Sequence, residues 1–191
     1  MPDDFSLDFA TKALFRGSLM IDFGRLKNQA LASLFTRFPS LGRKAADKVE
    51  TMRFDDTPWT PAPGPLSGLK MSLVTTAGAH INSDTPFEMI DKSGDPTFRV
   101  IPSSTPVADL MITHDYYDHK DADKDINIVF PIERLKEYVA EGRIGALSER
   151  LYGFMGHITD GHVDTFINRE IPKVSKMMKE DGVDVVLVTP G

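Results

Sequence analysis

The histidines of this 191-residue sequence are the residues that first suggest chemistry, because all five fall in three polar segments. Each segment follows an apolar run that is typical of a strand, and the histidines are His80 (in 78–96), His114 and His119 (in 114–130), and His157 and His162 (in 156–162). In open α/β sheets, ligands bind beyond the carboxyl ends of the strands. Polar residues also gather in loops for no catalytic reason, so the pattern alone leaves both interpretations open.

The segment GAHINSDTPF, residues 78–87, combines a flexible glycine with a histidine and an aspartate. Gly78 permits a close approach of the backbone to a ligand. His80 is expected to donate a hydrogen bond to a substrate carboxylate or to act as an acid, and Asp84 follows four residues later. The alternative is a structural turn capped by the polar side chains of residues 82–84.

The segment THDYYDHKDADKDIN, residues 113–127, is rich in aspartate, histidine and tyrosine. Carboxylates and imidazoles suit divalent cations, so a metal-dependent enzyme built on this loop is one hypothesis. The spacing matches no calcium-binding loop, and His114 and His119 do not have the spacing of a helical metal-ligand pair. The other interpretations are a solvated acidic loop and a substrate-binding loop that uses Asp115 and Tyr117.

The segment GFMGHITDGH, residues 153–162, is typical of a turn of small residues at the end of a strand. It has neither the spacing of a dinucleotide-binding fingerprint nor the lysine of a phosphate-binding loop. As a nucleotide-binding signature the segment is weak. No serine of the chain occupies a nucleophile elbow, so no hydrolase triad is assembled.

From residue 69 onward, alternating strand and helix patterns are expected to position these segments. Strands are expected at 69–78, 97–102, 109–114, 151–155 and 183–191, and helices at 131–142 and 163–181 with a kink or break at Pro172. The last run, VDVVLVTPG, is continuously apolar and β-branched, which predicts a central parallel strand covered on both faces. The predicted fold class is α/β, with a mostly parallel sheet and helices on both faces.

Residues 1–57 differ from the rest and predict a helical N-terminal arm, while residues 58–191 form the α/β part. Apolar residues recur at helical spacing from Phe23 to Phe38, Pro39 closes that helix, and a second helix is expected at 43–52. Residues 57–68, rich in proline and glycine, predict a linker. The arm is expected to pack on its own domain or on a neighbouring subunit. A helix on a membrane surface is the alternative, although its polar face mixes charge signs.

Composition narrows the class of protein. A net charge of −6 argues against nucleic-acid binding, and no apolar run is long enough to span a membrane. The chain contains no cysteine, so it has no disulfide, thiolate metal site or cysteine nucleophile. Its acidic start is unlike a secretory signal, and we expect a cytoplasmic protein without a metal site.

Taken in order, the segments resemble a known family: the selenoprotein B subunits of glycine, sarcosine and betaine reductases. The strongest likeness is to the related selenoprotein subunit of D-proline reductase. The matching stretches are collinear and are WTP (59–61), VTTAGAHINSDTPF (74–87), GDPTFRVIP (94–102), DLMITHDYYDHKDADKDINIVFPIERL (109–135), GFMG (153–156) and EDGVDVVLVTPG (180–191). Residues 1–57 lie outside this resemblance.

In that family, the segment similar to VDVVLVTPG is followed at once by selenocysteine, or by cysteine in some relatives, and then by a helix. The resemblance therefore implies a nucleophile directly after Gly191 and a sequence that stops at a recoded UGA codon. Such a chain would lack its catalytic residue, and its sheet would be incomplete at the C-terminus. A genuine stop codon and an artificial boundary are the alternatives. A nucleophile at a helix N-terminus would have a lowered pKa.

The resemblance further implies reductive cleavage of the carbon–nitrogen bond at the α-carbon of an amino acid or related amine. A partner subunit would carry a pyruvoyl group that captures the substrate amine, a dithiol system would supply electrons, and this chain would hold no other cofactor. Candidate residues that orient the substrate carboxylate or move protons are His80, His114 and Asp84. Candidate substrate-binding residues are Gly78, Asp115, Tyr117, Gly156, His157, Thr189 and Gly191. The competing hypothesis is a non-catalytic binding or assembly protein that docks a partner through its last strand.

Overall fold

The central element of the fold is β1 (Lys70–Thr75), which pairs with strands on both of its edges. The computed structural model of the chain describes residues 23–46, 56 and 60–191. β1 runs parallel to β5 (Ala146–Leu147) and β6 (Arg150–Phe154) on one side and to β7 (Val185–Thr189) on the other. β3 (Phe98–Pro102) continues the sheet antiparallel to β6. The predicted, mostly parallel α/β sheet is confirmed, and within this sheet only the two-residue strand β5 was not expected.

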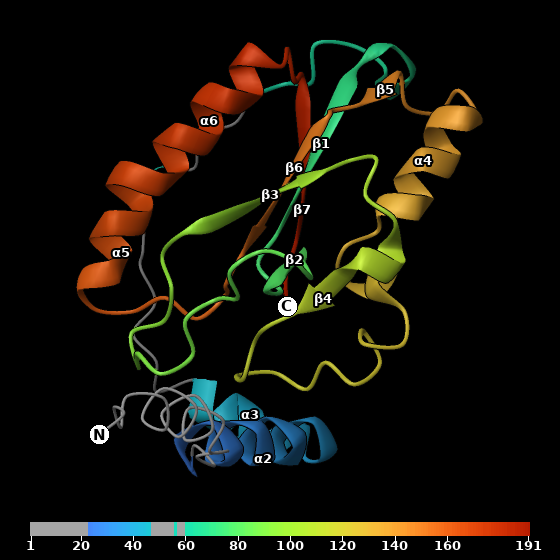
Figure 1. Ribbon diagram of the computed structural model, residues 1–191. Helices are drawn as coiled ribbons and strands as arrows, with labels where there is room; N and C mark the ends of the chain where they lie inside the picture. Colours follow the sequence, from blue (N-terminus) through green and yellow to red (C-terminus); the bar gives the residue numbers. More distant parts are fainter. Residues whose placement is uncertain (1–22, 47–55, 57–59) are drawn as a thin grey trace, which may run out of the picture.

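Helices cover both faces of this sheet, as Figure 1 shows. On one face, α4 (Ile132–Ala140) buries Ile132 and Leu135 against Leu73 of β1. On the other face, Val174 of α6 (Ile171–Glu180) packs with Tyr152 and Phe154 of β6. The expectation of helices on both faces is therefore confirmed. Both faces need a cover, because successive side chains of the central strands point to opposite sides of the sheet.

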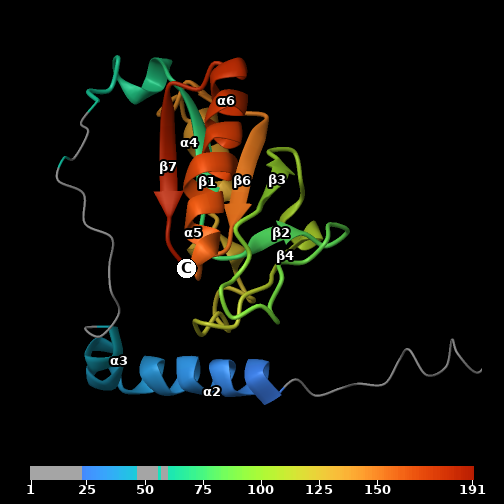
Figure 2. The same ribbon diagram turned by 90° about the vertical axis from the view of Figure 1, so that its left-hand side faces the viewer.

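The last strand, β7, lies at the edge of the sheet and not at its centre (Figure 2). Its only ladder partner among the described residues is β1. Its side chains alternate between half-buried and exposed, and Val186 and Val188 are 43% and 61% exposed. The prediction of a central strand covered on both faces is wrong for the described residues, because an apolar run does not reveal how many neighbours a strand has.

A separate two-stranded antiparallel ladder pairs β2 (Ala79–Ile81) with β4 (Leu110–Ile112). The strand expected at 109–114 is thus present, but it does not join the main sheet. His80 lies within β2, so the expectation that every histidine lies in a loop is wrong for this residue. β2 lies between Gly78 and a polar turn. With only three residues, this strand is too short to show the two-residue alternation of apolar and polar side chains that predicts a strand.

The expected helix at 163–181 forms as α5 (Gly161–Thr165), a π-helical turn at Phe166–Glu170, and α6. Pro172 stands in the first turn of α6, where its missing N–H costs no hydrogen bond. The helix continues through Pro172, so no break occurs there, and the kink at Pro172 stays a prediction. The π-helical turn that directly precedes α6 is a feature known to bend helices. Short 3₁₀ turns occur at Leu66–Gly68, Val107–Asp109 and Ile126–Ile128.

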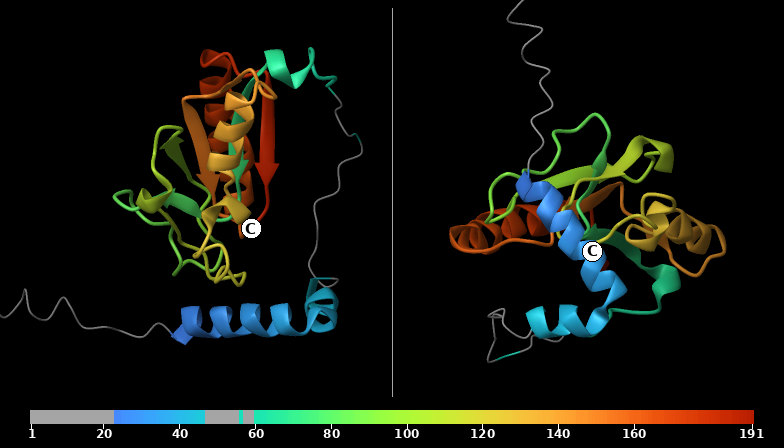
Figure 3. Two further views of the ribbon diagram at one scale, coloured as in Figure 1. Left: turned by 90° about the vertical axis from the view of Figure 1, so that its right-hand side faces the viewer. Right: turned by 90° about the horizontal axis from the view of Figure 1, so that it is seen from below.

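Two N-terminal helices, α2 (Phe23–Arg37) and α3 (Pro39–Ala46), lie beyond the carboxyl ends of the parallel strands (Figures 2 and 3). The first helix matches its prediction. The second begins at Pro39 and not near residue 43, because proline suits the first turn of a helix as well as the end of one. The remainder of the predicted arm (1–22 and 47–55) and Trp59 of the predicted linker lie outside the described residues.

Candidate functional site

The carboxyl ends of β1, β6 and β7 meet at one edge of the sheet, because the three strands run parallel. The backbone N–H of Gly78 donates to the carbonyl of Phe154 at 2.8 Å, which joins the ends of β1 and β6. The N–H of Thr76 donates to the carbonyl of Thr189 at 3.0 Å, which joins the ends of β1 and β7. This edge is where ligands bind in sheets of this class.

Glycine backbones let these ends come into direct contact. Gly78 has φ of 76°, and a Cβ there would lie 2.4 Å from the carbonyl oxygen of Thr113. A Cβ on Gly191 would lie 2.6 Å from Cα of Ala77, and one on Gly156 would lie 2.9 Å from the carbonyl oxygen of Thr76. Each glycine therefore fits where a side chain would collide with the neighbouring strand end.

Thr189 lies at this edge, but its hydroxyl forms a hydrogen bond within the protein. It donates to the carbonyl of Val129 at 2.6 Å, and the buried hydroxyl of Thr75 donates to the same carbonyl at 2.9 Å. The two threonines thereby fasten the ends of β1 and β7 to the segment before α4. Thr189 sets the position of the residues that follow it.

His114 lies in the centre of the strand-end cluster and is 5% exposed. The backbone N–H of Tyr116 donates to its Nδ1 at 3.1 Å, and the N–H of Gly156 points to its Nε2 at 3.3 Å. A neutral imidazole accepts at only one nitrogen, so only one of these two N–H groups donates to the ring in a given tautomer. Burial, assisted by the nearby His119 and His157, lowers the pKa of His114 to about 4.

Tyr117 packs edge-on against His114, with ring centroids 4.8 Å apart. Its hydroxyl donates to the carbonyl of Ala77 at 3.0 Å, next to Gly191. Burial, and then the charge of Asp123, raises the pKa of Tyr117 well above its ordinary value. The phenol is therefore protonated at neutral pH, and the ring connects His114 to the ends of β1 and β7.

Asp115 is 1% exposed and is bound by side chains of α2. Its Oδ2 accepts from Nε of Arg25 at 2.6 Å, and its Oδ1 accepts from Nη2 of Arg25 at 3.2 Å and from Nε2 of Gln29 at 2.8 Å. Sequence reasoning missed Arg25 and Gln29. The one signal that could have found them was their i, i+4 spacing on the polar side of an amphipathic helix.

His157 stacks on Tyr116, with ring centroids 3.8 Å apart and an interplanar angle of 17°. Its Nε2–H donates to the carbonyl of Lys92 at 2.9 Å. Tyr116 and His157 border a cleft of about 530 Å³ that α2 closes on its other side with Arg25 and Lys27. Tyr116 was not among the predicted site residues. It is adjacent to Tyr117 and of the same residue type, so the sequence did not distinguish the two.

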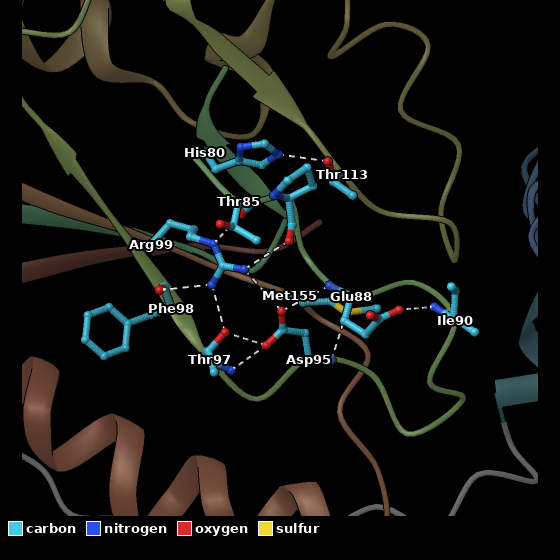
Figure 4. Close-up of polar contacts among 11 residues, drawn as sticks. His80, Thr85, Glu88, Ile90, Asp95, Thr97, Phe98, Arg99, Thr113 and Met155 are labelled. Atoms are coloured by element: carbon cyan, nitrogen blue, oxygen red, sulfur yellow. Dashed lines mark hydrogen bonds and ion pairs between the residues drawn. The ribbon is translucent and has the colours of Figure 1, made fainter. Parts of the chain in front are cut away.

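His80 is completely buried, and both of its ring nitrogens are hydrogen-bonded; Figure 4 shows the contact with Thr113. Nδ1 contacts the carbonyl of Ile81 at 2.8 Å, and Nε2 contacts the hydroxyl of Thr113 at 2.8 Å. The imidazole thus holds β2 against the residue that precedes His114. Asp84 follows the far end of β2, so the structure does not bring it to the strand-end cluster.

A second polar cluster, centred on Arg99, holds the segment 85–97 in place (Figure 4). The guanidinium donates to the carbonyls of Thr85 and Pro86 at 2.7 and 3.1 Å and to Asp95 at 3.2 Å. It also lies 4.4 Å from the ring centroid of Phe87, which in turn contacts His80 edge-on. Sequence reasoning missed this cluster, because its members are joined only by the fold.

The described part of the 113–127 loop contains ion pairs and no arrangement of three or more potential metal ligands. His119 Nδ1 contacts Oδ1 of Asp123 at 2.8 Å, and Lys124 pairs with Asp121 at 2.7 Å. Among residues 23–46, 56 and 60–191, no helix has both the length and the apolar character required to cross a bilayer.

The fold defines an α/β domain with a mostly parallel sheet, and Gly78, His114, Tyr117, Gly156 and Gly191 form a strand-end cluster at its carboxyl edge, which is the candidate site. The glycine/sarcosine/betaine reductase selenoprotein B family matches residues 42–191, and the chain belongs to that family. The resemblance inferred from the sequence is therefore confirmed, but residues 42–57, which were expected to lie outside it, fall within the match.

Several curated proteins are similar to the chain. It is 41% identical to the D-proline reductase subunit gamma of Acetoanaerobium sticklandii, over 70% of this chain and 53% of that protein. It is 29% identical to the sarcosine reductase complex component B subunit beta of Peptoclostridium acidaminophilum, and 31% identical to the glycine reductase complex component B subunit gamma of Carboxydothermus hydrogenoformans. Each of these two matches covers 78% of this chain and 34% of the relative.

The chain spans about half or less of the length of these curated relatives. No solved structure gives a significant match to it. The printed names of these homologues describe them as a reductase subunit or as components of reductase complexes.

Proposed function

We propose that the chain is the selenoprotein subunit of a cytoplasmic amino-acid reductase that cleaves a carbon–nitrogen bond at the substrate α-carbon. The observation that carries the proposal is the convergence of Gly78, His114, Tyr117, Gly156 and Gly191 at one sheet edge, in a chain of this family. Four segments far apart in the sequence contribute to this cluster, as a catalytic site requires.

The proposed nucleophile is a selenocysteine or cysteine at the position that follows Gly191 in the encoded polypeptide. The residues present fit such a group, because Gly191 passes directly over Ala77 and the Thr189 hydroxyl anchors the approach. A selenolate there would supply a nucleophile and electron carrier, so that Cα–N is replaced by Cα–H, the amine leaves, and a dithiol is oxidised to a disulfide.

His114 is the proposed proton-moving residue of this chain. Its lowered pKa keeps the ring neutral at neutral pH, so the ring cannot serve as a fixed cation for a carboxylate and accepts a proton only as a weak base. Tyr117 and the backbone N–H of Gly156 contact the ring, and His157 borders the adjoining cleft. Asp115, next in the chain to His114, is bound by Arg25 and Gln29 of α2. Gly78 contributes the close backbone contact beside them.

His80 and Asp84 are proposed for weaker roles. The buried His80 supports Thr113 next to His114, which suits a positioning residue. Asp84 is separated from the cluster by the length of β2 and remains a candidate for proton movement only through a rearranged loop. Alanine variants of both belong in the assay described below.

The proposed partners are an amino-acid or amine substrate, a subunit that bears a pyruvoyl group, and a dithiol reductant. The names of the relatives support four test substrates, which are D-proline, sarcosine, glycine and betaine. Their description as complex components or as a subunit supports the need for a partner chain.

The test is to produce the full encoded polypeptide with its partner subunit and to measure amine or amino-acid products with dithiothreitol as reductant. Mass spectrometry of the peptide that contains Gly191 would show selenium or sulfur at the next position. His114→Ala is expected to lower turnover at least about tenfold, while the partly exposed His162→Ala serves as the matched control. Full activity of His114→Ala would remove the proposed role of this residue, and a non-nucleophilic residue after Gly191 would refute the catalytic proposal.

A binding or assembly protein of the same fold is the second candidate, because β7 exposes Val186 and Val188 at an unpaired edge among the described residues. An unpaired apolar edge is a surface on which another strand can pair. The two candidates differ in the assay above: an assembly protein would bind its partner with no turnover of any of the four substrates.

A further inference from the structure

The cations that surround the strand-end cluster are mostly neutralised by carboxylates of the protein itself. They form ion pairs as follows: Arg25 with Asp115, Arg99 with Asp95, and Lys120 with Asp118. Within the cluster, His114 is neutral at neutral pH because its pKa is lowered to about 4. None of these groups is therefore available as a fixed positive charge for an anionic ligand.

Two lysines beside the cluster differ from these cations. Lys27 of α2 and Lys92 both line the cleft of about 530 Å³ that Tyr116 and His157 border. Within residues 23–46 and 60–191, neither lysine side chain forms an ion pair or a hydrogen bond. No acidic residue of the described chain lines this cleft, although the whole chain has a net charge of −6. The cleft is therefore a locally positive hollow on an acidic protein.

The nearest carboxylate in the sequence, that of Asp91, is occupied elsewhere. Its Oδ2 contacts Nε2 of His162 at 3.0 Å, and its Oδ1 accepts from the backbone N–H of Ser93 at 2.8 Å. Asp91 does not line the cleft, although it directly precedes Lys92 in the chain. It leaves the ammonium group of Lys92 without a bonded partner among the described residues.

The cleft adjoins the strand-end cluster through two of its walls. The ring of Tyr116 stacks on His157 at the cleft, while its backbone N–H lies 3.1 Å from Nδ1 of His114. Gly156, which precedes His157, contacts the other ring nitrogen of His114 at 3.3 Å. A ligand in the cleft thus lies next to the residues that contact His114.

Specific contacts hold both sides of the cleft in place. The hydrogen bonds of Arg25 to Asp115 and of Asn28 to Tyr116 fix α2 on either side of Lys27. Nε2–H of His157 donates to the backbone carbonyl of Lys92 at 2.9 Å. The two lysines are therefore placed before a ligand arrives, and binding requires no movement of α2.

We propose that this cleft binds the carboxylate of the small amino acid that serves as substrate, with Lys27 and Lys92 as the cationic donors. The four test substrates named above share a carboxylate and differ at nitrogen, which is primary in glycine, secondary in sarcosine and D-proline, and quaternary in betaine. A site for the carboxylate on this chain leaves the nitrogen free to face the partner subunit and its pyruvoyl group. A lysine ammonium donates up to three N–H bonds, and such bonds to a carboxylate are charge-assisted. The inference rests on the proposed function for the identity of the ligand, and it adds the residues that recognise it.

The size of the effect follows from the exposure of the lysines. Both are exposed, so solvent and salt screen each charge. Replacing either lysine with glutamine is expected to weaken the affinity for D-proline by about threefold to fivefold, and replacing both by at least about tenfold. Raising the NaCl concentration from about 50 to 500 mM is expected to weaken binding to the wild type and to have little effect on the double variant.

The test uses the full encoded polypeptide with its partner subunit and measures binding by isothermal titration calorimetry before any dithiol is added. The probes are D-proline, D-prolinamide, which lacks the carboxylate charge, and inorganic phosphate, an anion without an amine. D-prolinamide is expected to bind at least about tenfold more weakly than D-proline and to be indifferent to the lysine substitutions. Lys136→Gln, at an exposed position of α4 outside the cleft, is the matched control. Lys27→Arg and Lys92→Arg keep the charge and are expected to bind D-proline as the wild type does.

Three results would overturn the inference. They are unchanged affinity for D-proline in the double variant, equal affinities for D-proline and D-prolinamide, and lysine-dependent binding of phosphate that is tighter than that of D-proline.

The turnover assay separates this inference from the proposed function. The double variant is expected to raise KM by about tenfold with a smaller change in kcat, because the carboxylate contact is present in both the bound substrate and the transition state. Turnover with unchanged KM in the double variant would overturn the carboxylate site alone. Lysine-dependent binding of D-proline in a protein without reductase activity would support the carboxylate site and refute the proposed reaction.

Discussion

Replacing His114 with asparagine is expected to remove a large part of the loss of stability that the protein shows at acid pH. The pKa of His114 is lowered to about 4, first by burial and then by His119 and His157, whereas Asp115 acts in the opposite direction. The unfolded chain takes up this proton near pH 6.5. Stability is therefore unaffected by this group above that pH and falls as pH decreases from 6.5 toward 4.

The magnitude follows from the two pKa values. A decrease from 6.5 to about 4 corresponds to about 3 kcal/mol of unfolding free energy at full protonation, and to about 2 kcal/mol by pH 5. The protein loses the hydrogen bond from Tyr116 N–H when Nδ1 is protonated. Asparagine retains an acceptor near the Nδ1 position and cannot take up the proton.

The assay is urea unfolding followed by circular dichroism at several pH values between about 8 and 5. Aspartates whose pKa is lowered, such as Asp95 and Asp181, destabilise wild type and variant alike in acid, so they cancel in the difference. His162→Asn controls for the loss of a histidine, because the His162 side chain is 33% exposed. An acid limb equally steep in wild type and His114→Asn would refute the assignment of a buried, neutral imidazole.

Further substitutions test the packing that supports the site. Gly78→Ala is expected to destabilise the protein by about 2–4 kcal/mol in thermal melts, because the φ of Gly78 is 76° and a carbonyl blocks the Cβ position. Gly64→Ala is the control and should be nearly neutral, because a Cβ at Gly64 meets nothing within 4 Å. Equal melting temperatures of the two variants would contradict the strain at Gly78. Leu73→Ala, in the centre of β1, should cost about 2–5 kcal/mol, against a small effect of Leu66→Ala at an exposed position. Arg99→Lys should speed hydrogen exchange of residues 85–97 by about tenfold, because an ammonium cannot reproduce the planar, forked contacts; wild-type protection would show that the guanidinium is dispensable.

The elements with strong local patterns were the predictable ones. The strand β3 and the helix α4 follow from periodicity and proline chemistry over a few neighbouring residues. The edge position of β7 was not predictable, because its apolar residues specify a strand but not the number of strands beside it. β2 was missed because three residues carry no period.

The same division holds for the candidate site. Gly78, His114 and Gly156 were recognisable, because each follows an apolar, strand-like run and so falls at the edge where α/β sheets bind ligands. The burial of His80 with both nitrogens bonded, and the capture of Asp115 by Arg25, depend on partners 33 and 90 residues away in the chain. No local pattern encodes such contacts.

The order of residue types along the chain was therefore sufficient to determine the α/β class and the reductase family, because short-range periodicity and collinear motifs can be read from the sequence alone. Only the tertiary structure decided which of those residues meet, which carboxylate is buried and by whom, and which strand edge stays open. These properties are set by burial and by contacts between distant segments, and they come into existence only when the chain closes on itself.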